Sequence, residues 1–195
     1  MQIANLNINL PQKKEEEFLK IDFTSLFDFD FKEHKTLDFA LDLESIKDDE
    51  VYDSKLFSIA NSFDNSKRVL TISENLEKPL IIVNKLKNSE TLYTNNLLIN
   101  VKEGVKASVI EVFTSNLNNS TILANRTIEV EKNSSLEYVK IQDISISNSL
   151  IFSCKAKQDD KSNLEISNFE FGDGFCVNSF ENKIDSLEVN YELNG

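Results

Sequence analysis

Residues 99–110 (INVKEGVKASVI) and residues 128–139 (IEVEKNSSLEYV) are two copies of one pattern, set 29 positions apart. In each copy, two short runs of alternating apolar residues flank a turn that carries Gly104 in the first copy and Asn133 in the second. Both residue types tolerate the positive φ of a tight turn. Self-similarity at a period of about 20 to 50 residues is typical of stacked coils, in which one unit cannot bury its apolar face alone. This stretch therefore predicts a solenoid.

The second half of the pattern recurs further along the chain. Residues 135–138 (SLEY) are echoed by residues 163–166 (NLEI) and again by residues 186–189 (SLEV). Each copy places an apolar residue on either side of a glutamate, as a strand with one buried face requires. The alternative interpretation is an antiparallel sandwich whose short strands resemble one another by chance.

From about residue 68 onward, apolar runs separated by polar spacers predict a succession of short strands. These strands are expected at 69–72, 80–83, 97–101, 108–113, 127–130, 136–141 and 150–152. The spacers contain no pattern for crossover helices, which argues against a doubly wound α/β sheet. The predicted fold class is mainly β, with a right-handed parallel β-helix over residues 67–195 as the second domain.

Residues 1–66 predict a small α/β lobe as the first domain. A short helix is expected over 11–20, opened by Pro11, and a half-buried strand over 37–44, where apolar and polar residues alternate. A second helix is expected after Asp53 as its cap, with Leu56, Ile59, Ala60 and Phe63 on its apolar face. The core anchors predicted for this lobe are Phe23, Leu26, Phe27, Phe29 and Phe31.

Charge and composition exclude several functional classes. The chain has 33 acidic and 21 basic residues, a net charge of −12, which disfavours nucleic acid and anionic membrane surfaces as partners. The first ten residues lack the basic and apolar regions of a signal peptide, and no stretch approaches the roughly 18 to 20 apolar residues of a membrane span. Two cysteines do not make a disulfide framework. The predicted location is the cytoplasm.

Few residues are candidates for a chemical site. His34 is expected to be solvated, and the acidic pairs 48–49 and 159–160 are interpreted as solvated faces. Cys154 and Cys176 are expected at neighbouring positions on successive coils, either as two small buried hydrophobes or as a redox or ligand pair. Gly172 to Gly174 is too short for a phosphate-binding loop. We therefore predict no catalytic, cofactor-binding or metal-binding residue in this chain, and no enzyme.

Several stretches, in order, carry a resemblance to a known family: residues 11–22, 55–63 (KLFSIANSF), 77–83 (EKPLIIV), 99–113, 125–130, 136–142, 171–172 and 193–195. They resemble the SufB/SufD family of iron–sulfur cluster assembly proteins, and the SufD branch more than SufB. The chain departs from the family at Phe18 and Lys20, where Trp and Tyr are usual, and at Val177 and Asn178, near which an Arg is usual. Family members also usually continue for about as many residues again, so the chain is expected to be the front part of such a protein.

The resemblance implies a non-catalytic scaffold subunit that acts with a SufB-like partner and a SufC ATPase. It implies that no cofactor is bound by this chain alone and that the iron–sulfur cluster belongs to the complete complex. It also allows a homodimer. The alternatives are an exported carbohydrate-active or adhesin-like β-solenoid, which the N-terminus argues against, and a structural interaction module unrelated to cluster assembly.

Overall fold

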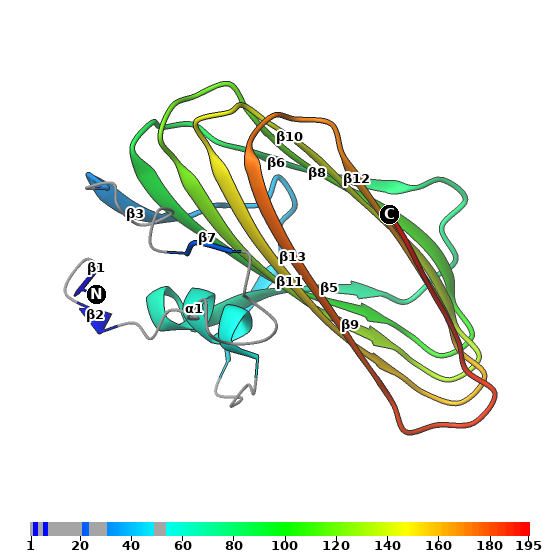
Figure 1. Cartoon of the computed structure of the whole chain (residues 1–195). Coiled ribbons are helices and arrows are strands. Elements are labelled where there is room, and N and C mark those ends of the chain that lie inside the picture. Colours follow the sequence, from blue (N-terminus) through cyan, green and yellow to red (C-terminus); the bar gives the residue numbers. More distant parts are fainter. Residues whose placement is uncertain (1, 4–5, 8–20, 24–30, 49–53) are drawn as a thin grey trace.

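Two sheets face each other and form the two walls of a solenoid (Figure 1); their strands are parallel except for β4, which pairs antiparallel with β5. This computed structural model describes residues 2–3, 6–7, 21–23, 31–48 and 54–195. The five-stranded sheet has the order β14-β12-β10-β8-β6, and the seven-stranded sheet has the order β13-β11-β9-β7-β5-β4, with β3 also paired to β7. From β5 onward, successive strands alternate between the two walls, so the chain winds through about 4 turns, and the predicted fold class is confirmed.

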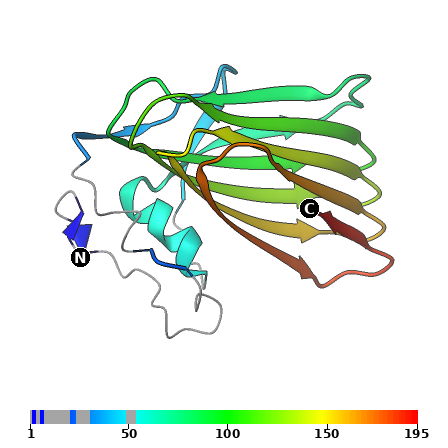
Figure 2. The ribbon, with the colours of Figure 1, turned by 45° about the horizontal axis from the view of Figure 1, so that its top comes forward.

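The strands of the five-stranded sheet are β6 (Leu80–Lys85), β8 (Lys106–Ser115), β10 (Ser135–Ile144), β12 (Asn163–Glu170) and β14 (Asn190–Asn194). Those of the seven-stranded sheet are β3 (Glu33–Thr36), β4 (Glu44–Lys47), β5 (Ser66–Ile72), β7 (Thr91–Val101), β9 (Thr121–Val130), β11 (Ser149–Gln158) and β13 (Phe175–Ile184). The remaining elements are the short pair β1 (Gln2–Ile3) and β2 (Leu6–Asn7), and the helix α1 (Lys55–Phe63). Figure 2 shows the strands of successive turns lying side by side.

The predicted repeat is the register of the solenoid. Ile99 pairs with Ile128 between β7 and β9, and Ala107 pairs with Leu136 between β8 and β10. The turn from β7 to β8 and the turn from β9 to β10 each contain a residue with positive φ, 73° at Gly104 and 58° at Asn133. The turns also stack, because the amide of Gly104 donates to the carbonyl of Lys132, 3.0 Å away. A period of 29 residues thus places like side chains and like turns on top of each other.

The last predicted copy of the strand pattern, at residues 186–189, is wrong. Leu164 pairs with Tyr191 of β14, not with Leu187, which lies in the preceding turn and is 76% exposed. The amide of Lys161 donates to the carbonyl of Leu187, and φ is 57° at both Lys161 and Glu188, so residues 186–189 are the equivalent of the Gly104 turn. Alternating apolar residues occur in this turn as well as in the strands, and the pattern alone did not separate them.

Helix α1 covers the outer face of the seven-stranded sheet. The expected apolar residues Leu56, Ile59 and Ala60 are buried there, and Phe63 is partly buried. They pack against a row of outward-facing residues on successive strands, Leu92, Leu123, Ile151 and Val177. Ser54 occupies the N-cap position without a side-chain hydrogen bond, and Asp53 lies outside the described residues.

The predicted strand over 37–44 is wrong, although its alternation reports burial correctly. Leu37 is buried, and Phe39, Leu41 and Leu43 pack against the interior core of the solenoid. The segment links β3 to β4, and at its start the amide of Leu37 still donates to the carbonyl of Thr94 on β7, 2.8 Å away. Of the predicted core anchors, Phe23 is buried and Phe31 is partly buried, whereas residues 11–20 and 24–30 lie outside the described residues.

A search of the helices in the described ranges finds none that is both long and apolar enough to span a membrane.

Candidate functional site in the solenoid interior

A group of polar side chains lies in the solenoid interior, with buried apolar residues on both sides of it along the strands. Strands that face each other across it point charged or amide side chains inward at positions where apolar residues are usual. The fully buried members are Asn84, Asn95, Glu111, Arg126, Lys140 and Gln142. Burying such groups is unfavourable unless they are paired and hydrogen-bonded, so their partners determine what this interior can do.

Arg126 on β9 and Glu111 on β8 form a bidentate ion pair between the two sheets. Nη2 lies 2.5 Å from Oε1 of Glu111, and Nε lies 2.8 Å from Oε2. Nη1 donates to the carbonyls of Asn95 and Asn125, and Nη2 also donates to the side-chain oxygen of Asn95. All five donors of the guanidinium are therefore used.

The carboxylate of Glu111 is equally occupied. Oε1 accepts from the amide of Asn84 at 2.5 Å, and Oε2 accepts from the hydroxyl of Tyr138. Burial and the charge of Glu111 both raise the pKa of Tyr138 well above its ordinary value. Burial lowers the pKa of Arg126, but the charge of Glu111 and its hydrogen bonds outweigh burial and raise it. Arg126 stays charged and Tyr138 stays neutral at ordinary pH.

Aromatic rings enclose this ion pair. The guanidinium carbon of Arg126 lies 5.4 Å from the ring centre of Phe113 and 5.9 Å from those of Phe39 and Phe152. Cation–π contacts of this kind stabilise a desolvated guanidinium. Every guanidinium donor and both carboxylate oxygens are used and rings surround them, so the Arg126–Glu111 pair has a structural character.

A second buried group, centred on Lys140 of β10, is less tightly paired. Its Nζ donates to the side-chain oxygen of Asn178 at 2.6 Å and lies 3.4 Å from Glu170 Oε1 and 3.5 Å from Cys176 Sγ. Nearby, the Nε2 atom of fully buried Gln142 has no hydrogen-bond partner. The Lys140 group therefore has unused hydrogen-bonding capacity, as does Asn84 beside Glu111, whose Oδ1 atom also has no partner.

The two cysteines are not neighbours in register, so that expectation is wrong. Cys176 of β13 pairs with Leu150, and Cys154 of β11 pairs with Phe180, four positions further along the same strands. The expectation depended on the misplaced echo at Leu187. Burial raises the pKa of both thiols to about 12. Both cysteines are therefore protonated at neutral pH, a state that neither attacks nor ligates well.

The other predicted positions lie away from this interior. His34 on β3 is exposed, but its Nε2 lies 3.2 Å from Thr94 Oγ1, and burial lowers its pKa. Asp48 is not solvated as expected: it is buried, with Lys67 Nζ 3.3 Å from Oδ1 and Asn61 donating to Oδ2. Part of one predicted acidic face is thus a buried anchor beside α1.

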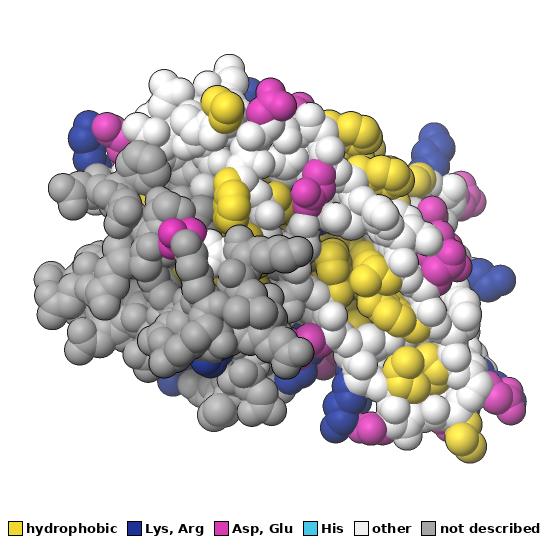
Figure 3. Space-filling model, viewed as in Figure 1, with side chains coloured by type: hydrophobic (Ala, Val, Ile, Leu, Met, Phe, Trp, Pro, Cys, Tyr) yellow, Lys and Arg dark blue, Asp and Glu magenta, His cyan; other side chains and the backbone are white. Residues whose placement is uncertain are grey.

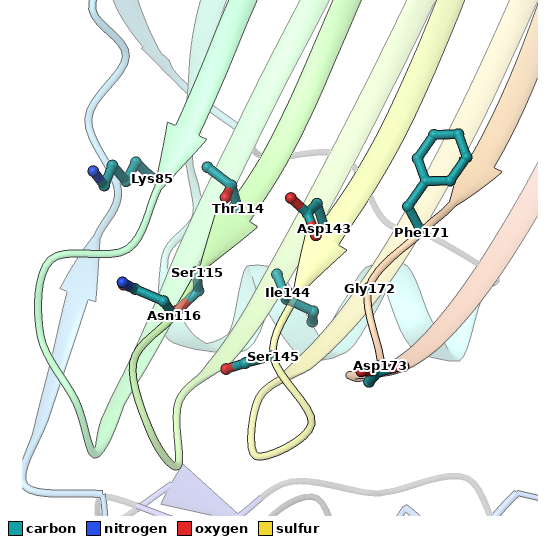
Figure 4. Close-up of a pocket in the computed structure, with 10 residues that line it drawn as sticks. All are labelled: Lys85, Thr114, Ser115, Asn116, Asp143, Ile144, Ser145, Phe171, Gly172 and Asp173. Carbon is teal, nitrogen blue, oxygen red and sulfur yellow. The ribbon is translucent and has the colours of Figure 1, made fainter.

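A groove of about 370 Å³ runs along one corner of the coils, where β6, β8 and β10 end (Figure 4). Its lining includes Lys85, Asn116, Asp143 and Asp173. Gly172 is required at its rim, because a Cβ atom there would overlap the backbone of Ile144. Among the described residues, no group of three or more His, Cys, Asp or Glu side chains is placed to hold a metal ion.

Sequence reasoning missed Glu111, Arg126 and Lys140. Each stands at an inward position of an alternating strand, for example Glu111 between Val109 and Phe113. That interruption of the apolar alternation was the available signal.

Comparison with known proteins gives one match. The profile of a family described as "SUF system FeS cluster assembly, SufBD core domain" matches residues 83–195, more than half of the chain. No curated protein and no solved structure matched the chain. The matched region begins in β6 and contains both buried groups of the interior.

Proposed function

Since the chain belongs to the SufBD core-domain family of SUF iron–sulfur cluster assembly, we propose that it is a SufD-like, non-catalytic scaffold subunit. It acts in the cytoplasm with a SufB-like partner and a SufC-type ATPase. The iron–sulfur cluster is the product that the complex builds, and this chain does not hold it alone. The family match does not favour the exported carbohydrate-active solenoid.

The observation that carries the proposal is the closed pairing of Arg126 with Glu111. A reactive interior keeps atoms available to a substrate, whereas here all guanidinium donors and both carboxylate oxygens are used within the chain. Protonated thiols at Cys154 and Cys176 also suit a subunit that does not ligate metal. An interior whose ion pair is satisfied within the chain favours a structural role.

The ends of both sheets suit assembly with another subunit. Within the described part of the chain, β13 and β14 are the last strands of their sheets, and each has a strand partner on one side only. An unpaired strand edge presents a row of backbone donors and acceptors that a further strand can use. In the proposed complex, the SufB-like partner supplies that strand.

Co-expression with SufB-like and SufC-like proteins tests the proposal. We expect a complex of defined stoichiometry by native mass spectrometry, and loss of cluster formation on the complex when this chain is omitted. Reconstitution of this chain alone with iron and sulfide is expected to leave no bound cluster, and the same mass spectra report whether the chain alone forms a homodimer. A stoichiometric cluster on the isolated chain, or a fully active complex without it, would overturn the proposal.

A further inference from the structure

The outer face of the five-stranded sheet carries two apolar ladders that run across its strands in register. One ladder is Ile81, Ile110 and Val139, and the other is Val83, Val112, Ile141 and Phe169. We call these seven residues the outer apolar face. Ile81, Val83 and Phe169 are 60%, 48% and 45% exposed, and the ring of Phe171 stacks on that of Phe169. Figure 3 shows apolar side chains at the surface in the region of β12.

The molecule itself shows how such a ladder is covered. On the opposite wall, the outward-facing Leu123, Ile151 and Val177 are in register on β9, β11 and β13. They are 1%, 2% and 6% exposed, because the apolar side of α1 packs over them (Figure 1). The contacts of α1 are with β7, β9 and β11. No helix in the described part of the chain lies on the outer apolar face.

The dimensions of the outer apolar face fit one helix. Residues two apart on a strand are about 7 Å apart, so the two ladders span a width that a helix about 10 Å across can cover. Contiguous apolar surface of this kind marks protein interaction sites.

The border of the outer apolar face selects the charge of its partner. Glu137, Glu165 and Glu192 stand in register on β10, β12 and β14. Glu137 lies two residues before Val139, and Asp143 stands on the other side of Ile141. A second copy of this chain, with net charge −12, would bring like charges together across the contact. A partner with Lys or Arg at its edges gains attraction instead.

We propose that the outer apolar face docks an amphipathic helix of another protein, with its apolar side on the two ladders and basic residues facing Glu137 and Glu165. This interaction does not rest on the proposed function, because it follows from the sheet surface alone. It adds a contact on the side of the solenoid, separate from the free strand edges.

A labelled synthetic helix tests the chemistry directly. The probe has about 18 residues, or five turns, with a leucine stripe and flanking lysines, and its binding to the full chain is measured by fluorescence anisotropy. Val112→Ser with Ile141→Ser is expected to weaken binding at least about tenfold, equivalent to 1.4 kcal/mol, while Lys157→Ser on the opposite wall leaves it unchanged. Glu137→Lys with Glu165→Lys is expected to reverse the preference, so that a probe with glutamates in place of lysines binds better.

Absence of probe binding, equal binding of the lysine and glutamate probes, or no effect of the Val112 and Ile141 substitutions would each overturn the proposal. The double glutamate variant keeps the test decisive even if the serine variants fail to fold, because Glu137 is exposed and Glu165 is partly exposed at the border. A photo-cross-linker at Val112 then identifies the cellular partner. Cross-linking to a basic amphipathic helix supports the proposal, and cross-linking to a second copy of the chain, or to nothing, contradicts it.

Discussion

Glu111 and Arg126 lie on opposite walls of the solenoid and meet in its interior, with 2.5 Å between Oε1 and Nη2 and neither side chain exposed to solvent. The pair joins the two sheets through charge rather than through apolar packing. Because water cannot replace either partner there, the consequences of removing one of them are large.

Glu111→Met is expected to lower the free energy of unfolding by about 3 to 5 kcal/mol, since it leaves the guanidinium of Arg126 charged and buried without a counterion. The double variant Glu111→Met with Arg126→Met is expected to be less destabilised than Glu111→Met alone. Denaturant unfolding followed by circular dichroism measures both. The matched control is the partly exposed pair Lys102–Glu131, at 2.6 Å, whose removal should cost no more than about 1 kcal/mol. Equal losses of unfolding free energy for the buried and the exposed pair would contradict the structural role assigned to the Arg126–Glu111 pair.

The stability of the chain is expected to fall as the pH rises from about 8.5 towards 12. The ordinary pKa of a thiol is about 8.5, and burial raises the pKa of Cys154 to about 12, so the unfolded chain loses this proton before the folded chain does. In that window the unfolded state binds fewer protons, and the slope is negative, about 1.4 kcal/mol per pH unit for each such cysteine. Cys154→Ala should reduce the slope measured between pH 8.5 and 10. An unchanged slope would mean that the thiol ionises equally in both states.

Neither cysteine is expected to react with iodoacetamide in the folded chain at pH 7 to 8, because both thiols are protonated and largely buried. Mass spectrometry of the native and the urea-unfolded protein, labelled for equal times, compares the two states. When labelling of the native protein is prolonged, Cys176 should react before Cys154, which is 2% exposed. Rapid labelling of Cys154 in native protein would show that the interior opens readily.

Lys161→Gly is expected to stabilise the chain by about 1 kcal/mol, since a side chain at φ 57° carries left-handed backbone strain that glycine relieves. Thermal unfolding monitors the change. Lys132→Gly, in the stacked turn one coil earlier, is the control, because Lys132 is not among the residues with positive φ and glycine there only loosens the unfolded chain. Stabilisation by both substitutions would point to a lost charge rather than to relieved strain.

Leu164→Ala is expected to cost about 2 to 5 kcal/mol, because Leu164 is fully buried between the coils. Leu187→Ala should change the free energy of unfolding by less than about 0.5 kcal/mol, since its side chain stands in solvent at a corner. Chemical denaturation of the two variants separates the strand from the turn. A large loss at Leu187 would restore the discarded alignment of residues 186–189 with the strand repeat.

The repeat made the solenoid predictable because stacking forces like residues into register, as with Ile99 and Ile128. Local alternation was less informative. It was the same in the strand at Leu164 and in the turn at Leu187, and only long-range pairing distinguishes the two. The interior site could not be predicted in full, because Glu111 and Arg126 belong to different strands on different walls. A charge at an inward position could be suspected from the sequence, but its partner could not be identified.

The corners of the solenoid differ in length while the strands stay in register. The corner 116–120 has one residue more than the corner 145–148, yet Ser115 still pairs with Ile144 before it and Thr121 with Ser149 after it. Within a strand, one added residue would turn every following side chain to the opposite face. Insertions and deletions can therefore accumulate at the corners without disturbing the interior. The sequence is therefore divided into strands, whose number of residues is fixed by the register, and corners, whose length is free to vary.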